Sequence, residues 1–260
     1  MRNFLFISPN YPAVNVRLAA GLSRAGFNIL GVGDAGYGDF PPELKDALTD
    51  YYYVPDLHEY ESVYRAVAYH ISRQGRIDIL ESFIPYWYDL ENKLRRDYRV
   101  KGRKTPKEYP ISVAEKANIP VPKRRSDGGL ILPKGDIIWI DGLVDKKGEI
   151  LISQAYTGDF EGGSFFYSLE SGVPSLLFCA EILKIYGISG GFFHLEFLLH
   201  KNKFFLLKAE DVLPCKFVAE AIKLSFGVDI YELWAGLRLG KKLSAIEGKS
   251  FGITAFAGLG

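Results

Sequence analysis

The segment Phe192–Leu199 reads FFHLEFLL, and after Lys201-Asn202-Lys203 the segment Phe204–Glu210 reads FFLLKAE. Two apolar runs rich in Phe and Leu, separated by a short polar stretch, predict the two antiparallel strands of a β-hairpin. Because successive side chains of a strand point to opposite faces, His194 and Glu196 share one face and the apolar residues between them lie on the other.

A three-residue tip at 201–203 would set the register of this hairpin. It places Glu196 opposite Lys208 and His194 opposite Glu210, so four polar groups converge on one face. One interpretation is a pair of cross-strand charge pairs on a solvated face, each contributing up to ~1 kcal/mol. The other is a site in which Glu196 and Glu210 hold a metal ion and His194 and Lys208 contact a ligand, although a lysine opposes the charge that a divalent cation needs.

The first hundred residues alternate short strands with helices. We expect strands at 4–8, 28–32, 51–54 and 77–82 and helices at 14–24, 41–48, 60–72 and 87–99. Alternation of this kind predicts a mostly parallel sheet that is covered by helices.

The middle of the chain is basic and irregular. Between Lys93 and Arg125 there are twelve Lys or Arg residues and prolines at 106, 110, 120 and 122. Beyond this stretch we expect a hairpin at 137–144 and 149–156, helices at 112–117, 174–186, 216–225 and 230–239, and a last strand at 250–256. The predicted organisation is an α/β domain at 1–100, a basic linker at 101–135 and an α+β domain at 136–260.

The composition excludes several classes of protein. With 260 residues, 48% hydrophobic content and a formal net charge of +1, the chain is globular and bulk charge implies no partner. Cys179 and Cys215 lack CxxC spacing, which argues against a disulfide framework or a zinc site and favours a cytoplasmic protein. No stretch approaches the ~20 apolar residues of a membrane span, so no membrane association is expected. Nucleic acid is not expected either, because few aromatic residues are interleaved with the basic segment.

Nucleophilic catalysis is not predicted, because the histidines are scattered and neither cysteine lies beside one. The motif Gly31-Val32-Gly33-Asp34-Ala35-Gly36 matches G-x-G-x-x-G. In a dinucleotide-binding fold, however, that motif follows the first strand and opens a helix, whereas here it follows the second strand and leads to Pro41-Pro42. We interpret it as a glycine-rich loop.

Ligands of α/β sheets bind at the carboxyl ends of the strands. The residues that follow the predicted strands of the first domain are therefore ligand-binding candidates. These are Ser8 and Asn10 after the first strand, Asp34 after the second, and Glu81, Tyr86 and Trp87, with Glu91 nearby, after the last. For Tyr86 and Trp87, helix packing is an equally good interpretation.

The hairpin FFHLEF at 192–197 resembles the metal-binding hairpin of ATP-grasp enzymes. Other segments also resemble ATP-grasp sequences, and they follow one another in the same order along the chain. These are FISPN at 6–10, ILGVGD at 29–34, ELKDAL at 43–48, IDILES at 77–82, LRRDY at 94–98, ANIPVP at 117–122 and IDGLVD at 140–145. The chain resembles the carboxylate–amine ligase and biotin-carboxylase-like group of the ATP-grasp superfamily.

The resemblance implies a Rossmann-like pre-ATP-grasp parallel sheet followed by an α+β ATP-grasp-like unit. It also implies enzymes that use ATP and Mg²⁺ to convert a carboxylate into an acyl-phosphate, which an amine attacks. Three departures stand against that chemistry. About seventeen residues replace the nucleotide lid between Pro122 and Ile140, Lys208 stands where the second metal carboxylate is expected, and Val212-Leu213-Pro214 lacks the usual Arg-Pro.

These losses would remove most of the electrostatic stabilisation that phosphoryl transfer needs. The leading hypothesis is a shortened, degenerate ATP-grasp-like protein that needs no cofactor. It would act as a non-catalytic binding or partner subunit, paired with an intact ATP-grasp subunit or with itself, and with a possible small-molecule ligand. The alternative is a reduced but active ligase that binds Mg²⁺ through Glu196 and Glu210 and uses ATP; a structural module without a ligand is a third class.

Overall fold

The computed structural model describes residues 1–100, 109–159, 165–168 and 172–246. The chain forms two compact units. The first comprises residues 1–106 together with 231–240, and the second comprises residues 107–230 together with 241–260. The helix at 231–240 therefore belongs to the first unit although it follows most of the second in sequence.

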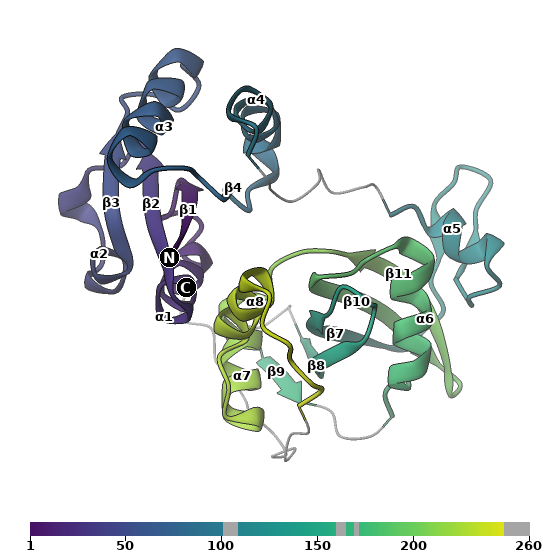
Figure 1. The fold of residues 1–260 in the computed structure, drawn as a ribbon. Coiled ribbons are helices and arrows are strands. Elements are labelled where there is room, and N and C mark those ends of the chain that lie inside the picture. Colours follow the sequence, from purple (N-terminus) through teal and green to yellow (C-terminus); the bar gives the residue numbers. More distant parts are fainter. Residues whose placement is uncertain (101–108, 160–164, 169–171, 247–260) are drawn as a thin grey trace. The chain divides into compact units, whose positions relative to one another are not determined.

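The first unit is built on a parallel sheet of four strands (Figure 1). The strand order is β3-β2-β1-β4, with β1 (Arg2–Ile7), β2 (Phe27–Gly33), β3 (Leu48–Tyr53) and β4 (Ile79–Glu81). The central strand β1 is buried on both faces, which is why its sequence is a nearly continuous apolar run. The predicted parallel sheet is confirmed.

Helices cover both faces of this sheet. They are α1 (Val14–Ala25), α2 (Pro42–Ala47), α3 (Tyr60–Gln74), α4 (Tyr88–Tyr98) and α8 (Ile230–Leu239), with short 3₁₀ turns at Tyr37–Asp39 and Pro85–Trp87. Leu5, Leu30 and Leu80 belong to one cluster with residues of α3 and α4. On the other face Phe4 makes an edge contact with Trp234 of α8 at a ring-centroid distance of 6.4 Å.

The second unit contains an antiparallel sheet of five strands in the order β11-β10-β7-β8-β9. The strands are β7 (Asp136–Val144), β8 (Ile150–Asp159), β9 (Phe165–Ser168), β10 (Gly191–His200) and β11 (Lys203–Glu210). The helices are α5 (Ile111–Lys116), α6 (Leu176–Tyr186) and α7 (Lys216–Phe226). The α+β organisation predicted for this part of the chain is confirmed.

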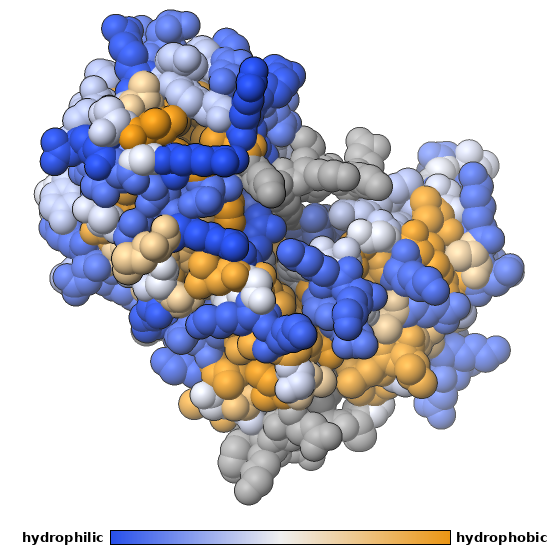
Figure 2. Space-filling view, viewed as in Figure 1, coloured by the Kyte–Doolittle hydropathy of each residue, from blue (hydrophilic) through white to orange (hydrophobic). Residues whose placement is uncertain are grey.

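One face of this sheet forms the core of the second unit. Phe193, Leu195 and Phe197 of β10 are fully buried there with Ile138 and Ile140 of β7, against residues of α5 and α6. The intervening polar residues of β10 therefore lie on the opposite face, as the alternation predicts. Figure 2 shows hydrophobic residues reaching the surface among hydrophilic ones, and the exposed apolar residues of this unit include Leu177 of α6.

The tip of the β10–β11 hairpin differs from the prediction. His200 pairs with Lys203, so the tip is two residues, Lys201 and Asn202, with positive φ of 47° and 58°, as in a type I′ turn. A bulge then follows, because Phe197 pairs with Leu206 whereas Glu196 pairs with Lys208. The predicted pairs Glu196–Lys208 and His194–Glu210 are confirmed only because the bulge offsets the shorter tip.

The segment between α5 and β7, the first strand of the second sheet, is short. After α5 it contains a two-stranded antiparallel pair, β5 (Lys123–Arg124) and β6 (Leu130–Ile131), which the sequence did not predict. β7 begins at Asp136, so β5 and β6 are the regular structure that stands in the position of a lid. The strand predicted at 250–256 lies outside the described residues. Within the described ranges, none of the helices is both long enough and apolar enough to span a membrane.

Candidate functional site

Two rows of cross-strand neighbours lie on the open face of the second sheet. The first row runs through Glu210, His194, Asp141 and Gln154, which are register partners on β11, β10, β7 and β8. The second row runs in the same strand order through Lys208, Glu196, Trp139 and Tyr156. The sheet thus gathers five acidic or basic side chains, Asp141, His194, Glu196, Lys208 and Glu210, and the phenol of Tyr156, from residues that are up to 69 positions apart in sequence.

Asp141 is the buried centre of this face. It is 3% exposed, accepts a short hydrogen bond from the Tyr156 hydroxyl through Oδ2, and lies 3.2 Å from His194 Nδ1 through Oδ1. Burial and the charge of Asp141 raise the pKa of Tyr156, so the phenol remains protonated as the donor. Both carboxylate oxygens of Asp141 are therefore engaged by side chains of neighbouring strands.

The environment of His194 favours its charged form. Burial alone would lower the pKa of His194, but the hydrogen bond and charge of Asp141, followed by the charges of Glu196 and Glu210, outweigh burial and raise the pKa. A protonated His194 donates from Nδ1 to Asp141 and carries positive charge among three carboxylates. In that form His194 offsets the charge of Asp141, its partner in the first row.

The ion pairs on this face differ from those predicted across the hairpin. Lys208 Nζ lies 3.0 Å from Glu210 Oε1, a neighbour two residues along the same strand, and His194 pairs with Asp141 rather than with Glu210. Glu196 makes no ion pair with Lys208 among the described residues, although the two are backbone register partners. The pairing of the Lys208 ammonium with Glu210 agrees with an internally neutralised pair, but the expected pair with Glu196 is not formed. The cross-strand pair of His194 with Glu210 is wrong, because the partner of His194 is Asp141 on β7, the neighbour of β10 on the side away from β11.

The residues present do not fit a magnesium ion. Mg²⁺ requires oxygen ligands in an octahedral arrangement, but here an ammonium group lies against one of the two candidate carboxylates, Glu210, and opposite the other, Glu196. In the described part of the chain, no group of three or more His, Cys, Asp or Glu side chains could hold a metal ion. Lys208 supplies part of the positive charge that a cation would bring.

Solved structures of known proteins resemble this one. The L-amino acid ligase of Bacillus licheniformis superimposes with a TM-score of 0.65 at 12% identity, covering 92% of this chain and 74% of its own. The phosphoribosylaminoimidazole carboxylase ATPase subunit of Aquifex aeolicus gives 0.64 at 11% identity, covering 95% and 79%. The biotin carboxylase domain of the Hydrogenobacter thermophilus 2-oxoglutarate carboxylase, solved with MgADP and bicarbonate, gives 0.66 at 10% identity, covering 93% and 70%.

The chain has the ATP-grasp fold. The similarity spans both units, so the resemblance inferred from the short motifs is confirmed at the level of the fold. No protein-family model and no curated protein sequence matches the chain. In the hairpin β10–β11, Lys208 stands where the resemblance implies a carboxylate.

In the first unit of this ATP-grasp fold, Ser8 and Asn10 follow β1 and lie at the carboxyl edge of the parallel sheet, as predicted. Asn15, which is fully buried, joins the loops after β1 and β4, because its Nδ2 donates to the carbonyls of Tyr11 at 2.8 Å and Ser82 at 3.0 Å. Asn10 Oδ1 and Asn15 Oδ1 are buried and have no hydrogen-bond partner among the described residues. Two acceptors are thus available at this edge.

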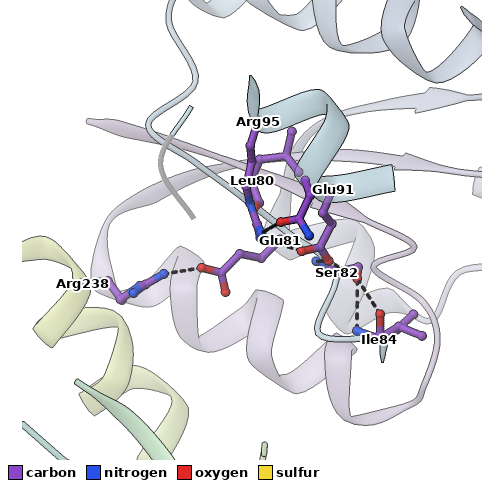
Figure 3. A network of polar contacts seen from close by, with 8 residues as sticks. Leu80, Glu81, Ser82, Ile84, Glu91, Arg95 and Arg238 are labelled. Atoms are coloured by element: carbon purple, nitrogen blue, oxygen red, sulfur yellow. Dashed lines mark hydrogen bonds and ion pairs between the residues drawn. The ribbon is translucent and has the colours of Figure 1, made fainter. Parts of the chain in front are cut away.

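Glu81 ends β4 and belongs to a buried ion-pair network (Figure 3). Its Oε1 accepts a short hydrogen bond from Arg238 of α8. Next to it, Glu91 of α4 accepts from the Ser82 amide at 2.6 Å and lies 2.6 Å from Arg95 Nη2. Arg95 also donates to the Leu80 carbonyl from two nitrogens, at 2.8 and 2.6 Å. The network therefore fixes the backbone at the end of β4.

Tyr86 and Trp87 lie in a separate cluster from Ser8, Asn10 and Glu81. Tyr86 is 70% exposed, and its hydroxyl is 2.8 Å from His58 Nε2. Trp87 makes edge contacts with His58 and Tyr86 at ring-centroid distances of 5.0 and 4.8 Å and also packs on the core. Helix packing therefore accounts for part of the role of Trp87, but Tyr86 faces solvent.

Asp34 is exposed in the loop after β2. The glycines before it are explained by packing, because a Cβ at Gly31 or Gly33 would come within 2.8 or 2.9 Å of the Tyr51 side chain. The chain after Gly36 forms a 3₁₀ turn, and the next helix begins only at Pro42. The motif thus provides space for Tyr51 over β2.

Sequence reasoning missed three functional-site residues. Asp141 was an isolated carboxylate inside the apolar run of β7, and that isolation was the available signal, because a carboxylate in a buried strand needs a partner. Asn15 and Arg238 carry no such signal, since their partners are 67 and 157 residues away.

Proposed function

We propose that this ATP-grasp-fold chain is a non-catalytic binding or partner subunit of a ligase system. The observation that carries the proposal is the ion pair of Lys208 with Glu210, 3.0 Å apart, on the hairpin face where the resemblance implies two metal-binding carboxylates. An ammonium fixed to the chain offsets the carboxylate charge without a metal, and it would repel a divalent cation. The short β5–β6 pair in place of a lid supports the same conclusion.

Calorimetric titration with Mg-ATP tests this function against a reduced but active ligase. We expect no saturable binding by the full chain at ligand concentrations up to the millimolar range, where typical enzyme substrates bind. Micromolar binding that disappears in Glu196→Ala, but persists in the control Glu149→Ala at a distant turn, would establish the ligase alternative and reject our proposal.

A retained small-molecule ligand is supported by the buried oxygens of Asn10 and Asn15. Buried acceptors without donors are uncommon, and a ligand that carries N–H groups would satisfy them. We expect amines and amides to raise the melting temperature of the protein more than matched carboxylates do. The same shift in Asn10→Leu as in the wild type would place the ligand elsewhere.

The partner is proposed to be an intact ATP-grasp subunit or a second copy of this chain. Purification of the tagged chain from its native cell, followed by size-exclusion chromatography with light scattering, distinguishes the two. A monomer that elutes alone would leave the binding role without a partner and would favour a structural module.

A further inference from the structure

A hydrogen-bonded chain of three side chains lies on the surface of the first unit. His58 Nδ1 is 2.7 Å from Asp56 Oδ1, and His58 Nε2 is 2.8 Å from the Tyr86 hydroxyl. The His58 backbone amide also donates to Asp56 Oδ1 at 2.8 Å, which holds the carboxylate beside Nδ1. Sequence patterns did not predict this group, because His58 and Tyr86 are 28 residues apart.

The partners determine which atom carries each proton. An ionised carboxylate only accepts hydrogen bonds, so the Nδ1–H of His58 donates to Asp56. In the neutral ring Nε2 is then the acceptor, and the Tyr86 hydroxyl must donate to it. The hydrogen bonds from the backbone amide and the side chain of His58 lower the pKa of Asp56, which keeps this carboxylate charged.

Trp87 restricts the movement of the histidine. Its ring makes an edge contact with His58 at 5.0 Å and another with Tyr86 at 4.8 Å, while the Tyr86 ring itself lies edge-on to His58 at 5.7 Å. A carboxylate, an imidazole and a hydroxyl in hydrogen-bonded sequence, with the base oriented by the carboxylate, is the arrangement that activates hydroxyl nucleophiles. The hydroxyl here is a phenol that is 70% exposed and therefore accessible.

We propose that Asp56, His58 and Tyr86 form a nucleophilic relay in which Tyr86 accepts an acyl group from a neutral activated ester. The Tyr86 oxygen attacks the carbonyl carbon of the ester while His58 Nε2 takes the phenolic proton, and Asp56 stabilises the resulting imidazolium. The bond between the carbonyl carbon and the leaving oxygen then breaks. The leaving group departs with the electron pair of that bond and receives the proton from His58, so that acyl-Tyr86 and a free alcohol or phenol result.

The charges around the relay favour an acyl over a phosphoryl group. A phosphoryl group carries negative charge that is stabilised by Arg, Lys or a metal ion. In the part of the chain that the structure describes, no Lys or Arg contacts Asp56, His58 or Tyr86, and Asp56 is itself negative. A neutral carbonyl needs no such cation, and the Trp87 ring provides an apolar surface beside it. The inference involves the first unit alone and does not depend on the proposed function.

Acetylation by p-nitrophenyl acetate tests this relay. The full-length chain is incubated with the ester, quenched in acid, and mapped by peptide mass spectrometry. Tyr11 and Tyr53, which are 66% and 53% exposed, serve as internal controls because they have similar access and, among the described residues, their hydroxyls have no hydrogen-bonded base. We expect Tyr86 to be acetylated at least tenfold faster than either control, with a rate that is already high near pH 7, because a general base contributes about 10²-fold or more.

Variants separate the roles of the three residues. His58→Gln should reduce acetylation of Tyr86 to the level of Tyr11, whereas His200→Gln, which changes a half-buried histidine of the second unit, should have no effect. Asp56 is a positioning residue, and Asp56→Asn should move the pH profile of the Tyr86 reaction rather than abolish it. Equal rates at Tyr86 and Tyr11 in the wild type, an unchanged rate in His58→Gln, or acetylation at His58 that persists in Tyr86→Phe would each overturn the proposal.

Discussion

Both units of this protein pair a carboxylate with a basic side chain, but at very different depths. The side chains of Glu91 and Arg95 in the first unit are 2% and 10% exposed. Those of Glu210 and Lys208 in the second unit are 32% and 53% exposed. The buried pair also binds the backbone at Leu80 and Ser82, whereas the exposed pair makes no such backbone contact among the described residues. Glu91 and Arg95 therefore maintain the fold, and Lys208 changes the charge of a surface.

The depth of each ion pair determines whether it contributes mainly to stability or mainly to the charge of the surface. Phe83, which follows Ser82, has a positive φ of 61°, a conformation that is unfavourable for a bulky residue unless its surroundings enforce it. The hydrogen bonds of Ser82 and Glu91 hold the chain on one side of this turn. The exposed pair is screened by solvent, so its contribution to stability is small and its effect on ligand charge is the more important one.

Arg95→Met should have the largest effect on stability. Removing the guanidinium leaves Glu91 buried without its counter-charge and leaves the Leu80 carbonyl without its donors, at a cost of about 3–5 kcal/mol. Urea denaturation at pH 8 measures the loss, and Arg96→Met, at an exposed position of the same helix, is the matched control. A loss of unfolding free energy below about 1 kcal/mol, similar to that of the control, would mean that the buried pair contributes no more to stability than an exposed one does.

Glu91→Gln should change the pH dependence of stability. Burial raises the pKa of Glu91 from 4.5 to about 7, against the opposing charge of Arg95. Between these values the folded protein holds a proton that the unfolded chain has released, so stability falls as pH rises through this window. Relative to Glu91→Gln, the wild type should lose on the order of 2 kcal/mol between pH 4.5 and pH 8. Parallel stability profiles of the two proteins would contradict this assignment.

Local signals in the sequence predicted most elements of the fold. Alternation in Phe192–Leu199 predicted the strand β10 and its polar face, and Gly26 and Gly187, which end helices in the left-handed conformation, marked the ends of α1 and α6. The register was obtained with an incorrect tip, because the bulge opposite Glu196 and Phe197 has no clear sequence signature. It allows Leu206 to be buried while Lys208 faces solvent.

Contacts between distant segments could not be predicted in the same way. The partner of His194 is Asp141, which lies 53 residues earlier on a strand that the hairpin alone does not identify. The partner of Glu81 is Arg238, on a helix that returns to the first unit after the whole second sheet. Pattern reasoning identified which residues face the same way along one strand, but not which strand lies beside them.

His194→Gln should reveal a smaller contribution to pH-dependent stability in the second unit. Because the pKa of His194 is raised above its ordinary 6.5, its stabilising effect is fully present below that value and is lost as pH rises through the folded pKa. We expect the variant to be less stable than the wild type by about 1 kcal/mol at pH 5.5 and nearly equal at pH 9. His200→Gln controls for another half-buried histidine of this unit, and a difference that grows with pH would contradict the account.

Lys208→Met should have the smallest effect on stability. Exposed ion pairs contribute about 0.2–1 kcal/mol, less in high salt. We expect a loss within this range in low salt, which disappears in 1 M NaCl. The control Lys203→Met, at the first residue of β11, should lose less, because among the described residues Lys203 forms no ion pair. A loss as large as that of Arg95→Met would show that the exposed pair also maintains the fold.

The most direct test of the central claim, that Lys208 neutralises the hairpin face in place of a metal ion, is a calorimetric titration of Lys208→Glu with Mg²⁺ and Mn²⁺. Lys203→Glu, which makes the same charge change at the residue directly after the tip, is the control. The account predicts no saturable binding by the wild type or the control. It predicts saturable binding by Lys208→Glu, with a dissociation constant at least tenfold below the highest ion concentration tested, since three carboxylates would then face one another. No gain in Lys208→Glu, or saturable binding by the wild type that is lost in Glu196→Ala, would contradict it.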